Sequence, residues 1–470
     1  MLFTSFPFLI FIFSFFPLYF LATQKTKIVL IVLFSYFFYA WWDYRLLLLL
    51  IFSITFDYII GILMDKEKNK ENKKKFLYLS IFLNVGIFFI FKYLNFFIDS
   101  LYSVLDNLNF SLNKNTFNII LPIGISFFTF QKLSYIIDLY NRKCNVEKNY
   151  MIFSSYVSLF PQLIAGPIVR AKRLLPQLNK KIKFILPRFI DGLILVFWGF
   201  FLKICVADTL SIFTDPCFDN PESYGSMSLL LGSIFFSFQL YGDFAGYSLI
   251  AIGLGKMMGF DFGINFNSPY FADSIRNFWQ RWHISLSTWF RDYVYIPLGG
   301  NRNGVLNRYK YVLVTMSLAG LWHGSNLTFL IWGLIHAIML IMEDSFSRFF
   351  KFKQGNSFFK LIKIIFVFLC VTFALIVFRS DNLTSATFFI NKIFEFKNLF
   401  DGTSVHKFYI FKGILLISIV IFTDYFTNKS KIKRQFNNNN KIKFISLLIL
   451  ALSISFFGTF NEVPFIYFQF

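Results

Sequence analysis

Long apolar runs separated by short polar loops repeat along the whole chain of 470 residues. The runs are continuous and do not alternate between apolar and polar positions, which is typical of helices and not of membrane β-barrel strands. Several runs reach the roughly 20 residues that a helix needs to cross a bilayer. The pattern predicts an all-α, polytopic membrane protein with about 11 transmembrane helices. We expect it to form a single integral-membrane domain over residues 1–470.

The composition supports a membrane protein and argues against a nucleic-acid partner. Hydrophobic residues make up 56% of the chain, 72 residues are phenylalanine, and the mean hydropathy is +0.59. The net charge is +21, but the lysines and arginines gather in short loops between apolar runs. Basic loops of this kind stay in the cytoplasm, near anionic lipid headgroups. We therefore expect membrane lipids, and no nucleic acid, as partners of the basic residues.

The cysteines and histidines are too dispersed to predict a disulfide framework or a metal site. No CxxC motif or Cys/His cluster occurs, and the four histidines lie far apart in the sequence. The cysteines stand at four scattered positions, Cys144, Cys205, Cys217 and Cys370.

The charges of the loops predict the orientation of the spans. Asp65–Lys75 holds six lysines against three acids, and Val169–Arg188 has seven basic residues and no acid, so both should be cytoplasmic. Ala207–Ser226 has four acids and no base and should be an outer loop. The first apolar segment, Leu2–Ala22, has no preceding basic residue and no clear cleavage site, so we expect a retained first span. Segment 151–165 should enter and leave on the cytoplasmic side as a re-entrant segment.

The same reasoning predicts a bend around His323. Lys310 and Ser347–Lys353 should both be cytoplasmic, so the apolar segment between them must go out and come back in two arms shorter than full spans. The turn falls near Gly320–Asn326, and irregular backbone at membrane depth needs surrounding protein or a water-filled cavity. Glycines 320 and 324 let another group approach closely.

An imidazole at such a turn can take a proton from a hydroxyl and return it. His336 closes the same apolar run, and a lone histidine of this kind is usually a packed core residue. A Ser-His-Asp triad stays open as an alternative, although the chain has no GxSxG nucleophile elbow.

Segment Ser274–Arg302 predicts an amphipathic helix at the cytoplasmic interface. Its apolar positions recur at helical spacing: Ile275, Phe278, Trp279, Trp282, Leu286, Trp289, Phe290 and Tyr293. Its other face carries Arg276, Gln280, His283, Ser287 and Arg291. An interfacial anchor explains the tryptophans but not His283, which a lysine could replace in that role.

Asp243 lies inside a long apolar run. An ionisable residue at that depth is costly and is a functional candidate by default. Two interpretations are open: a functional carboxylate, or a buried pair with a basic residue or hydroxyl.

Several segments together resemble the membrane-bound O-acyltransferase family. The resemblance lies in five segments in the family's order: Leu121–Tyr140, Phe160–Arg170, Tyr241–Gly253, Phe278–Arg302 and Gly320–Ala337. The motif-bearing core is about 119–342. The bacterial branch holds polysaccharide O-acetyltransferases of the alginate O-acetylase type, which extends to peptidoglycan, and D-alanyl transferases of teichoic acid. The segments "YVYIPLGGNR", "GLWHG" and "FIYFQF" are similar to the acetylase type.

The resemblance implies a family fold with His323 as the catalytic histidine and His283 as a second important one. His323 would be a general base or form a short-lived acetyl-histidine, and His283 would help position the thioester. Asp243 or Tyr241 would orient the imidazole. Further supporting candidates are Trp322, Arg291 and Asn326.

The implied reaction moves acetyl groups across the inner membrane of a bacterium. Acetyl-CoA, or another acetyl thioester, would be the cytoplasmic donor substrate, with no permanently bound cofactor. A polysaccharide outside, such as peptidoglycan or an alginate-like exopolysaccharide, would be the acceptor. The partner would be a periplasmic acetyltransferase of the SGNH/GDSL type.

Two other functions stay open. The first is D-alanyl transfer to teichoic acid. The second is a transporter or flippase that uses Asp243 and the histidines as a proton relay. Transporter folds commonly show internal repeat symmetry, which this sequence lacks.

Overall fold

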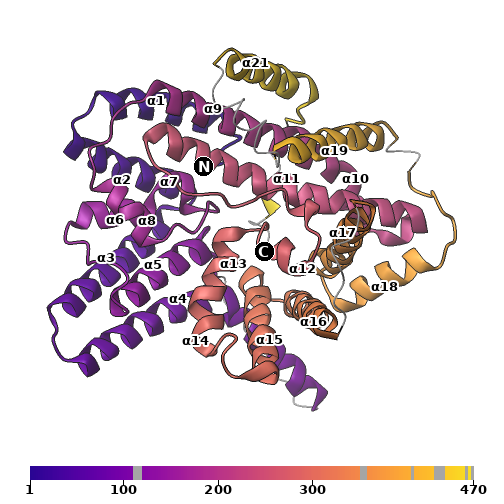
Figure 1. The fold of residues 1–470 in the computed structure, drawn as a ribbon, viewed down its shortest axis with the longest axis horizontal. Helices are drawn as coiled ribbons and strands as arrows, with labels where there is room; N and C mark the ends of the chain where they lie inside the picture. Colours follow the sequence, from indigo (N-terminus) through magenta and orange to yellow (C-terminus); the bar gives the residue numbers. More distant parts are fainter. Residues whose placement is uncertain (109–118, 350–356, 404–406, 428–439, 461–463, 467–470) are drawn as a thin grey trace. The chain divides into compact units, whose positions relative to one another are not determined.

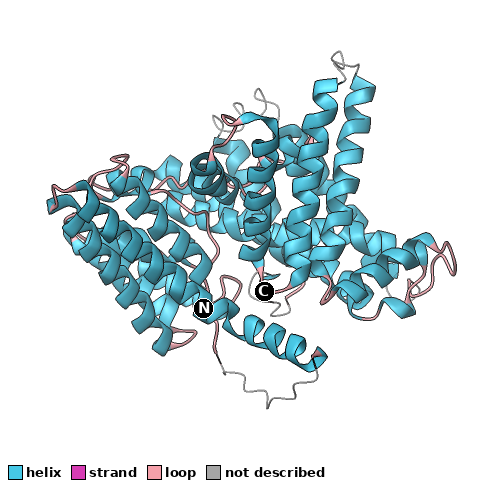
Figure 2. Cartoon of the chain, turned by 90° about the horizontal axis from the view of Figure 1, so that it is seen from below, coloured by secondary structure: helices cyan, strands magenta, loops and turns pink. Residues whose placement is uncertain are grey.

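Every regular element is a helix in the described parts of the chain, which confirms the all-α prediction (Figures 1 and 2). The computed structural model describes residues 1–108, 119–349, 357–403, 407–427, 440–460 and 464–466. The chain divides into two compact units: Met1–Gly192 with Leu254–Gly263, and Leu193–Gly253 with Ile264–Phe470. The single domain expected from the sequence stays a prediction.

Eight helices within the described ranges are long and apolar enough to cross a membrane, as expected of a polytopic membrane protein. They are Tyr44–Lys66, Lys70–Asp106, Leu186–Asp219, Ser226–Met258, Leu327–Arg348, Ser357–Arg379, Lys407–Thr427 and Asn440–Phe457. A shorter apolar helix spans Phe6–Leu21. The number of spans and their orientation stay predictions.

The first unit holds the helices of the amino-terminal part of the chain. They are α1 (Phe6–Leu21), α2 (Gln24–Ala40), α3 (Tyr44–Lys66), α4 (Lys70–Asn107), α5 (Ile125–Tyr140), α6 (Tyr150–Ser158), α7 (Phe160–Leu163) and α8 (Ala171–Leu178). Side-chain oxygens of Thr23, Asp43 and Asn69 accept backbone N–H groups at the starts of α2, α3 and α4. Segment 151–165 is broken at Leu159, and Pro161 lies in the first turn of α7. Its re-entrant placement in a membrane stays a prediction.

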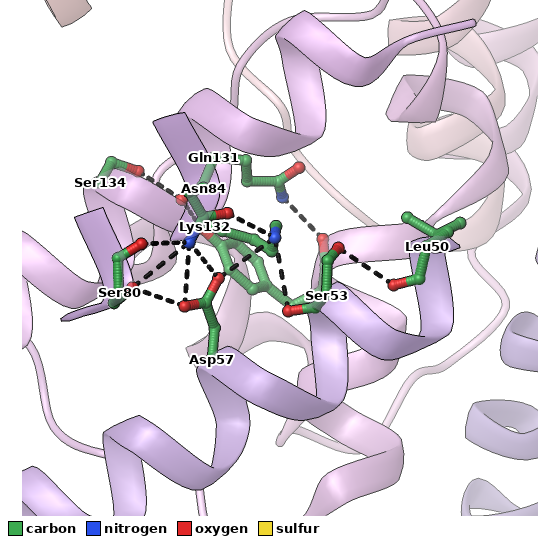
Figure 3. A network of polar contacts seen from close by, with 9 residues as sticks. Leu50, Ser53, Asp57, Ser80, Asn84, Gln131, Lys132 and Ser134 are labelled. Carbon is green, nitrogen blue, oxygen red and sulfur yellow. Dashed lines mark hydrogen bonds and ion pairs between the residues drawn. The ribbon is translucent and has the colours of Figure 1, made fainter. Parts of the chain in front are cut away.

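A buried ion pair lies among α3, α4 and α5 in the first unit (Figure 3). The Lys132 ammonium lies 3.2 Å from the Asp57 carboxylate and donates to Oδ1 of Asn84 at 2.6 Å. Ser80 and Asn84 both donate to Asp57. Because a buried charge needs a partner and hydrogen bonds, this network fixes how the three helices pack.

The second unit holds the longer carboxy-terminal part. Its helices are the π-helix η1 (Phe201–Ala207), α10 (Asp208–Asp219), η2 (Pro221–Ser223), η3 (Pro269–Phe271), α12 (Ile275–Trp279), α13 (Ile284–Phe290), the π-helix η4 (Arg291–Tyr295), α14 (Ile296–Leu298), α15 (Gly304–His323), α16 (Leu327–Phe349), α17 (Ser357–Arg379), α18 (Leu383–Phe394), α19 (Lys407–Thr427) and α21 (Asn440–Phe457). Helices α9 (Leu186–Phe200) and α11 (Ser226–Met258) have residues in both units.

The acidic segment Ala207–Ser226 is not simply an outer loop, because most of it is helix α10. Asp208, the first residue of α10, is buried and lies 2.8 Å from Nζ of Lys203. The wider turn of η1 places residues five apart on one face, which brings Lys203 under Asp208. The sequence prediction of a loop failed because this carboxylate is paired inside the protein and not solvated.

The segment Ser274–Arg302 is broken and is not the single amphipathic helix that the spacing predicts. Four short helices, α12, α13, η4 and α14, follow one another. Between α12 and α13 the backbone of His283 adopts the left-handed conformation, with φ of 42°. That reversal lets the Ile284 N–H donate to the Asn265 carbonyl at 2.8 Å. A tertiary hydrogen bond therefore interrupts the helical pattern.

Helices α15 and α16 form a hairpin whose turn lies at residues 324–326, which confirms the predicted bend (Figure 1). The two arms have 20 and 23 residues. How far each arm crosses the membrane, and so the short arms expected from the sequence, stays a prediction. Gly320 and Gly333 face each other between them, and a Cβ on either would overlap the backbone of the opposite helix. The predicted close approach at Gly320 is thus made by α16 itself.

Candidate active site

A small cavity in the second unit is lined by aromatic and aliphatic side chains and two histidines. Six helices, α11, η3, α12, α15, α16 and α17, and the loop after α12 contribute to it. The lining residues are Leu240, Tyr270, Phe278, Trp282, His323, Trp332, His336, Val371, Leu375 and Phe378. An apolar cavity with a few convergent polar groups is the usual form of a small-molecule site.

His323 is the last residue of α15 and its imidazole faces this cavity. The side chain is 4% exposed. Three aromatic rings meet it edge-on, with centroid distances of 5.0 Å for Trp322, 5.1 Å for Trp332 and 5.3 Å for Phe378. These rings fix the orientation of the imidazole at the turn.

Three histidines and two tryptophans form one row of touching rings. Trp322 lies between His283 and His323, at centroid distances of 5.9 Å and 5.0 Å. Trp332 lies between His323 and His336, at 5.1 Å and 4.8 Å. Trp322 and His323 end α15, and Trp332 and His336 lie one helical turn apart on α16. His283 joins the row from the turn between α12 and α13. His336 therefore lies in the same site as His323, and the core-residue interpretation was incomplete.

His283 is fully buried and is not on an exposed polar face as the helical spacing predicts. Its Nδ1 lies 3.3 Å from Oδ1 of Asn265. A carboxamide oxygen only accepts, so Nδ1 carries the proton and Nε2 is the basic nitrogen. Burial lowers the pKa of His283 to about 3, so the ring is neutral at neutral pH.

Asn265 was missed by sequence analysis, although it organises the turn that holds His283. It is fully buried, its Nδ2 donates to Ser248 at 3.1 Å, and its Oδ1 also accepts the Ser285 N–H at 3.1 Å. An asparagine in a polar loop carries no signal of this role before the chain is folded.

The chain is similar to known membrane acyltransferases over most of its length. The profile of the membrane-bound O-acyltransferase family matches residues 146–380. A protein of Pseudomonas putida, named a probable alginate O-acetylase, is 40% identical over 82% of this chain and 79% of its own. This chain belongs to the membrane-bound O-acyltransferase family.

Other relatives place this acyltransferase nearer to acetylases than to alanyl transferases. The peptidoglycan O-acetyltransferase of Helicobacter pylori is 33% identical over 98% of this chain and 96% of its own. The teichoic acid D-alanyltransferase of Bacillus subtilis is 29% identical over 56% of this chain and 69% of its own. The chain is thus an acyltransferase of a multi-pass membrane family, with relatives named for O-acetylation.

In this acyltransferase Asp243 is part of a buried ion pair and does not orient His323. Its Oδ1 accepts from Lys203 at 2.6 Å and its Oδ2 accepts the backbone N–H of Ile466 at 2.9 Å. The second of the two interpretations offered for Asp243 is correct. A pairing across 40 positions in the chain could not be predicted from the sequence.

Tyr241 also has another partner. Its hydroxyl donates to Oδ2 of Asp424 in α19 at 3.0 Å, and its ring packs against Tyr270 and Trp282. The expectation that Tyr241 orients the imidazole of His323 is therefore wrong. It supports the aromatic wall of the cavity instead.

The remaining candidates have structural contacts. Arg291 is exposed and its Nε donates to the neighbouring Asp292 at 2.8 Å, outside the set of cavity-lining residues. Asn326 accepts the Thr328 N–H at the start of α16 and donates to the Asp381 carbonyl at 2.6 Å. Trp322, by contrast, contacts His323 directly, with ring centroids 5.0 Å apart.

Proposed function

We propose that this acyltransferase moves acetyl groups from a cytoplasmic acetyl thioester, such as acetyl-CoA, to a polysaccharide outside the inner membrane of a bacterium. The observation that carries the proposal is the buried imidazole of His323 facing an apolar cavity at the hairpin turn. Two relatives named for alginate and peptidoglycan acetylation support acetyl as the acyl group. The fuller coverage by these relatives favours acetyl over D-alanyl transfer.

In this mechanism His323 is the general base. Its unprotonated ring nitrogen takes the proton of the acceptor hydroxyl while the hydroxyl oxygen bonds to the acetyl carbon. The carbonyl electron pair moves onto oxygen and then returns as the C–S bond breaks. The proton on His323 passes to the leaving thiolate. A short-lived acetyl-histidine is the covalent variant of the same transfer.

His283 contributes by position in this proposal. Its Nε2 is the basic nitrogen, and the Trp322 ring separates its imidazole from His323. As a neutral imidazole at one end of the row of rings, His283 can accept a hydrogen bond from the acyl-donor molecule near its thioester. No permanently bound cofactor enters the reaction.

The acceptor is a hydroxyl of peptidoglycan or of an alginate-like exopolysaccharide, reached directly or through a periplasmic SGNH/GDSL-type acetyltransferase. Membrane lipids surround the spans.

Mass spectrometry of peptidoglycan and exported glycans, from strains with and without the gene, tests the proposal. We expect O-acetyl groups on one of these polymers to disappear without the gene and with His323→Ala. Membrane fractionation checks that the variant inserts. Arg291→Gln is the matched control, because an exposed pair contributes little, and it should acetylate normally. Normal acetylation by His323→Ala would overturn the assigned role of His323, and unchanged glycans in the deletion strain would overturn the function.

A further inference from the structure

His336 is a fully buried imidazole whose hydrogen-bonding atoms are unused within the described chain. Neither ring nitrogen has a hydrogen-bond partner among the described residues. Phe278, Trp279 and Trp332 surround it, at centroid distances of 6.2, 5.1 and 4.8 Å. A neutral imidazole carries one donor and one acceptor, and burying both without partners is unfavourable. Such a group in a core needs a specific explanation.

A second unpartnered donor lies next to it. The indole N–H of Trp332 has no hydrogen-bond acceptor in the described part of the chain, and the Trp332 side chain is 3% exposed. Both Trp332 and His336 line the cavity that His323 lines. Two buried hydrogen-bond donors, Trp332 and His336, and one base, His323, therefore line the same apolar cavity. Acyl transfer requires a base and donors of this kind.

We propose that His336 and the Trp332 indole donate hydrogen bonds to the carbonyl oxygen of the acyl group during transfer. This inference rests on the proposed function and adds to it the groups that stabilise the developing negative charge. The hydroxyl oxygen of the acceptor bonds to the carbonyl carbon, and its proton goes to His323. The carbonyl electron pair moves onto oxygen, where the two N–H groups meet it. The pair then reforms the carbonyl, the C–S bond breaks, and the proton passes from His323 to the thiolate.

The arrangement fits this role better than simple packing does. A phenylalanine would fill the space between Phe278, Trp279 and Trp332 without leaving polar atoms unpaired. The surrounding rings fix these donors in a cavity with little water. The donors therefore need not reorganise when negative charge develops on the carbonyl oxygen, and they stabilise that charge more strongly than they would in water. The cluster of aromatic rings holds both side chains in place.

The test compares His336→Phe, His336→Gln and Trp332→Phe with the wild type in lipid nanodiscs, using acetyl-CoA and the polymer acetylated by the wild-type strain. Each variant keeps a side chain near the original size, and His336→Gln and wild type both keep a donor. Initial rates of acetyl incorporation give kcat and KM, and thermal unfolding reports the fold.

We expect His336→Phe to lower kcat by roughly 10²- to 10³-fold with little change in KM, the loss typical of a missing oxyanion donor. His336→Gln should recover at least part of that loss, and Trp332→Phe should lower kcat as well. Wild-type kcat in His336→Phe would overturn the inference. So would equal losses in His336→Gln and His336→Phe that follow lowered thermal stability, because packing alone then explains them.

The two failures are distinguishable. If the wild-type strain acetylates no polymer, the proposed function fails and the inference fails with it. If the wild type acetylates and His336→Phe does so at the same rate, only the inference fails. If His336→Phe does not fold, Trp332→Phe tests the inference. A wild-type kcat in that variant would overturn the proposal that the two side chains both donate to the carbonyl oxygen.

Discussion

Lys203 donates a hydrogen bond to Asp243 at 2.6 Å, and the same ammonium lies 2.8 Å from Asp208. All three side chains are buried. The Lys203 ammonium thus pairs with two carboxylates from different helices. The three side chains together join η1 and α10 to α11. The two acids are held differently, because Asp243 also accepts the backbone N–H of Ile466.

Lys203→Met should destabilise the protein more than Asp243→Asn. Removing the lysine leaves two carboxylates buried without a cation, and breaking a buried pair costs about 3–5 kcal/mol. In Asp243→Asn the lysine keeps Asp208, and the amide oxygen can still accept the Ile466 N–H. Thermal unfolding in detergent measures the order of the two losses. Folded Asp243→Asn should keep its acetyl transfer rate, and a rate near zero would restore Asp243 as an orienting residue.

Gly320→Ala and Gly333→Ala should both lower stability and activity. A Cβ at Gly320 would overlap the Phe329 carbonyl, and one at Gly333 would overlap the Met316 carbonyl, so the helices of the hairpin must separate. The turn that carries His323 would shift with them. Gly86→Ala is the control, because a Cβ there meets open space and alanine favours a helix by about 1 kcal/mol. Unfolding temperatures and transfer rates of the three variants test this, and equal behaviour would contradict it.

Lowering the pH should destabilise the protein partly through His283. Burial lowers its pKa from the ordinary value of 6.5 to about 3, so the unfolded chain binds the proton and the folded chain does not. The stability that the neutral ring contributes is present above pH 6.5 and is lost progressively as the pH falls towards 3. We expect the unfolding temperature to drop as the pH falls from 6.5 towards 3, the window set by those values. His283→Gln should show a shallower drop, and an identical pH profile would contradict the assignment.

Lys132 and Asp57 in the first unit should be strongly coupled. Each single variant, Lys132→Met or Asp57→Leu, leaves one buried charge unpaired and should cost about 3–5 kcal/mol. The double variant removes both charges and should lose less than the sum of the single losses. Thermal unfolding of the wild type, the two single variants and the double variant gives a double-mutant cycle. Additive losses of stability would show that the pair is not coupled. Transfer rates per folded protein should stay near wild type, since the pair lies in the unit without the histidines.

Local features of this protein could be predicted from its sequence better than long-range ones. The turn after His323 was placed correctly, because the basic segments on either side of the apolar run are signals in the sequence itself. The amphipathic helix over Ser274–Arg302 was wrong, since the Asn265 carbonyl competes for the backbone at His283. Periodicity reports how residues would lie on an uninterrupted helix and cannot register a hydrogen bond from a distant loop.

The sequence by itself determined the helical membrane class, the family and the turn at His323, because apolar runs, loop charges and long motifs are local properties of the chain. Only the tertiary structure decided that Asp243 pairs with Lys203, that Asn265 holds His283, and that His336 shares a cavity with His323. These relationships depend on which side chains meet after the helices pack. Buried polar groups take whichever partner the packing brings within hydrogen-bond distance, and the order of residues does not specify that partner.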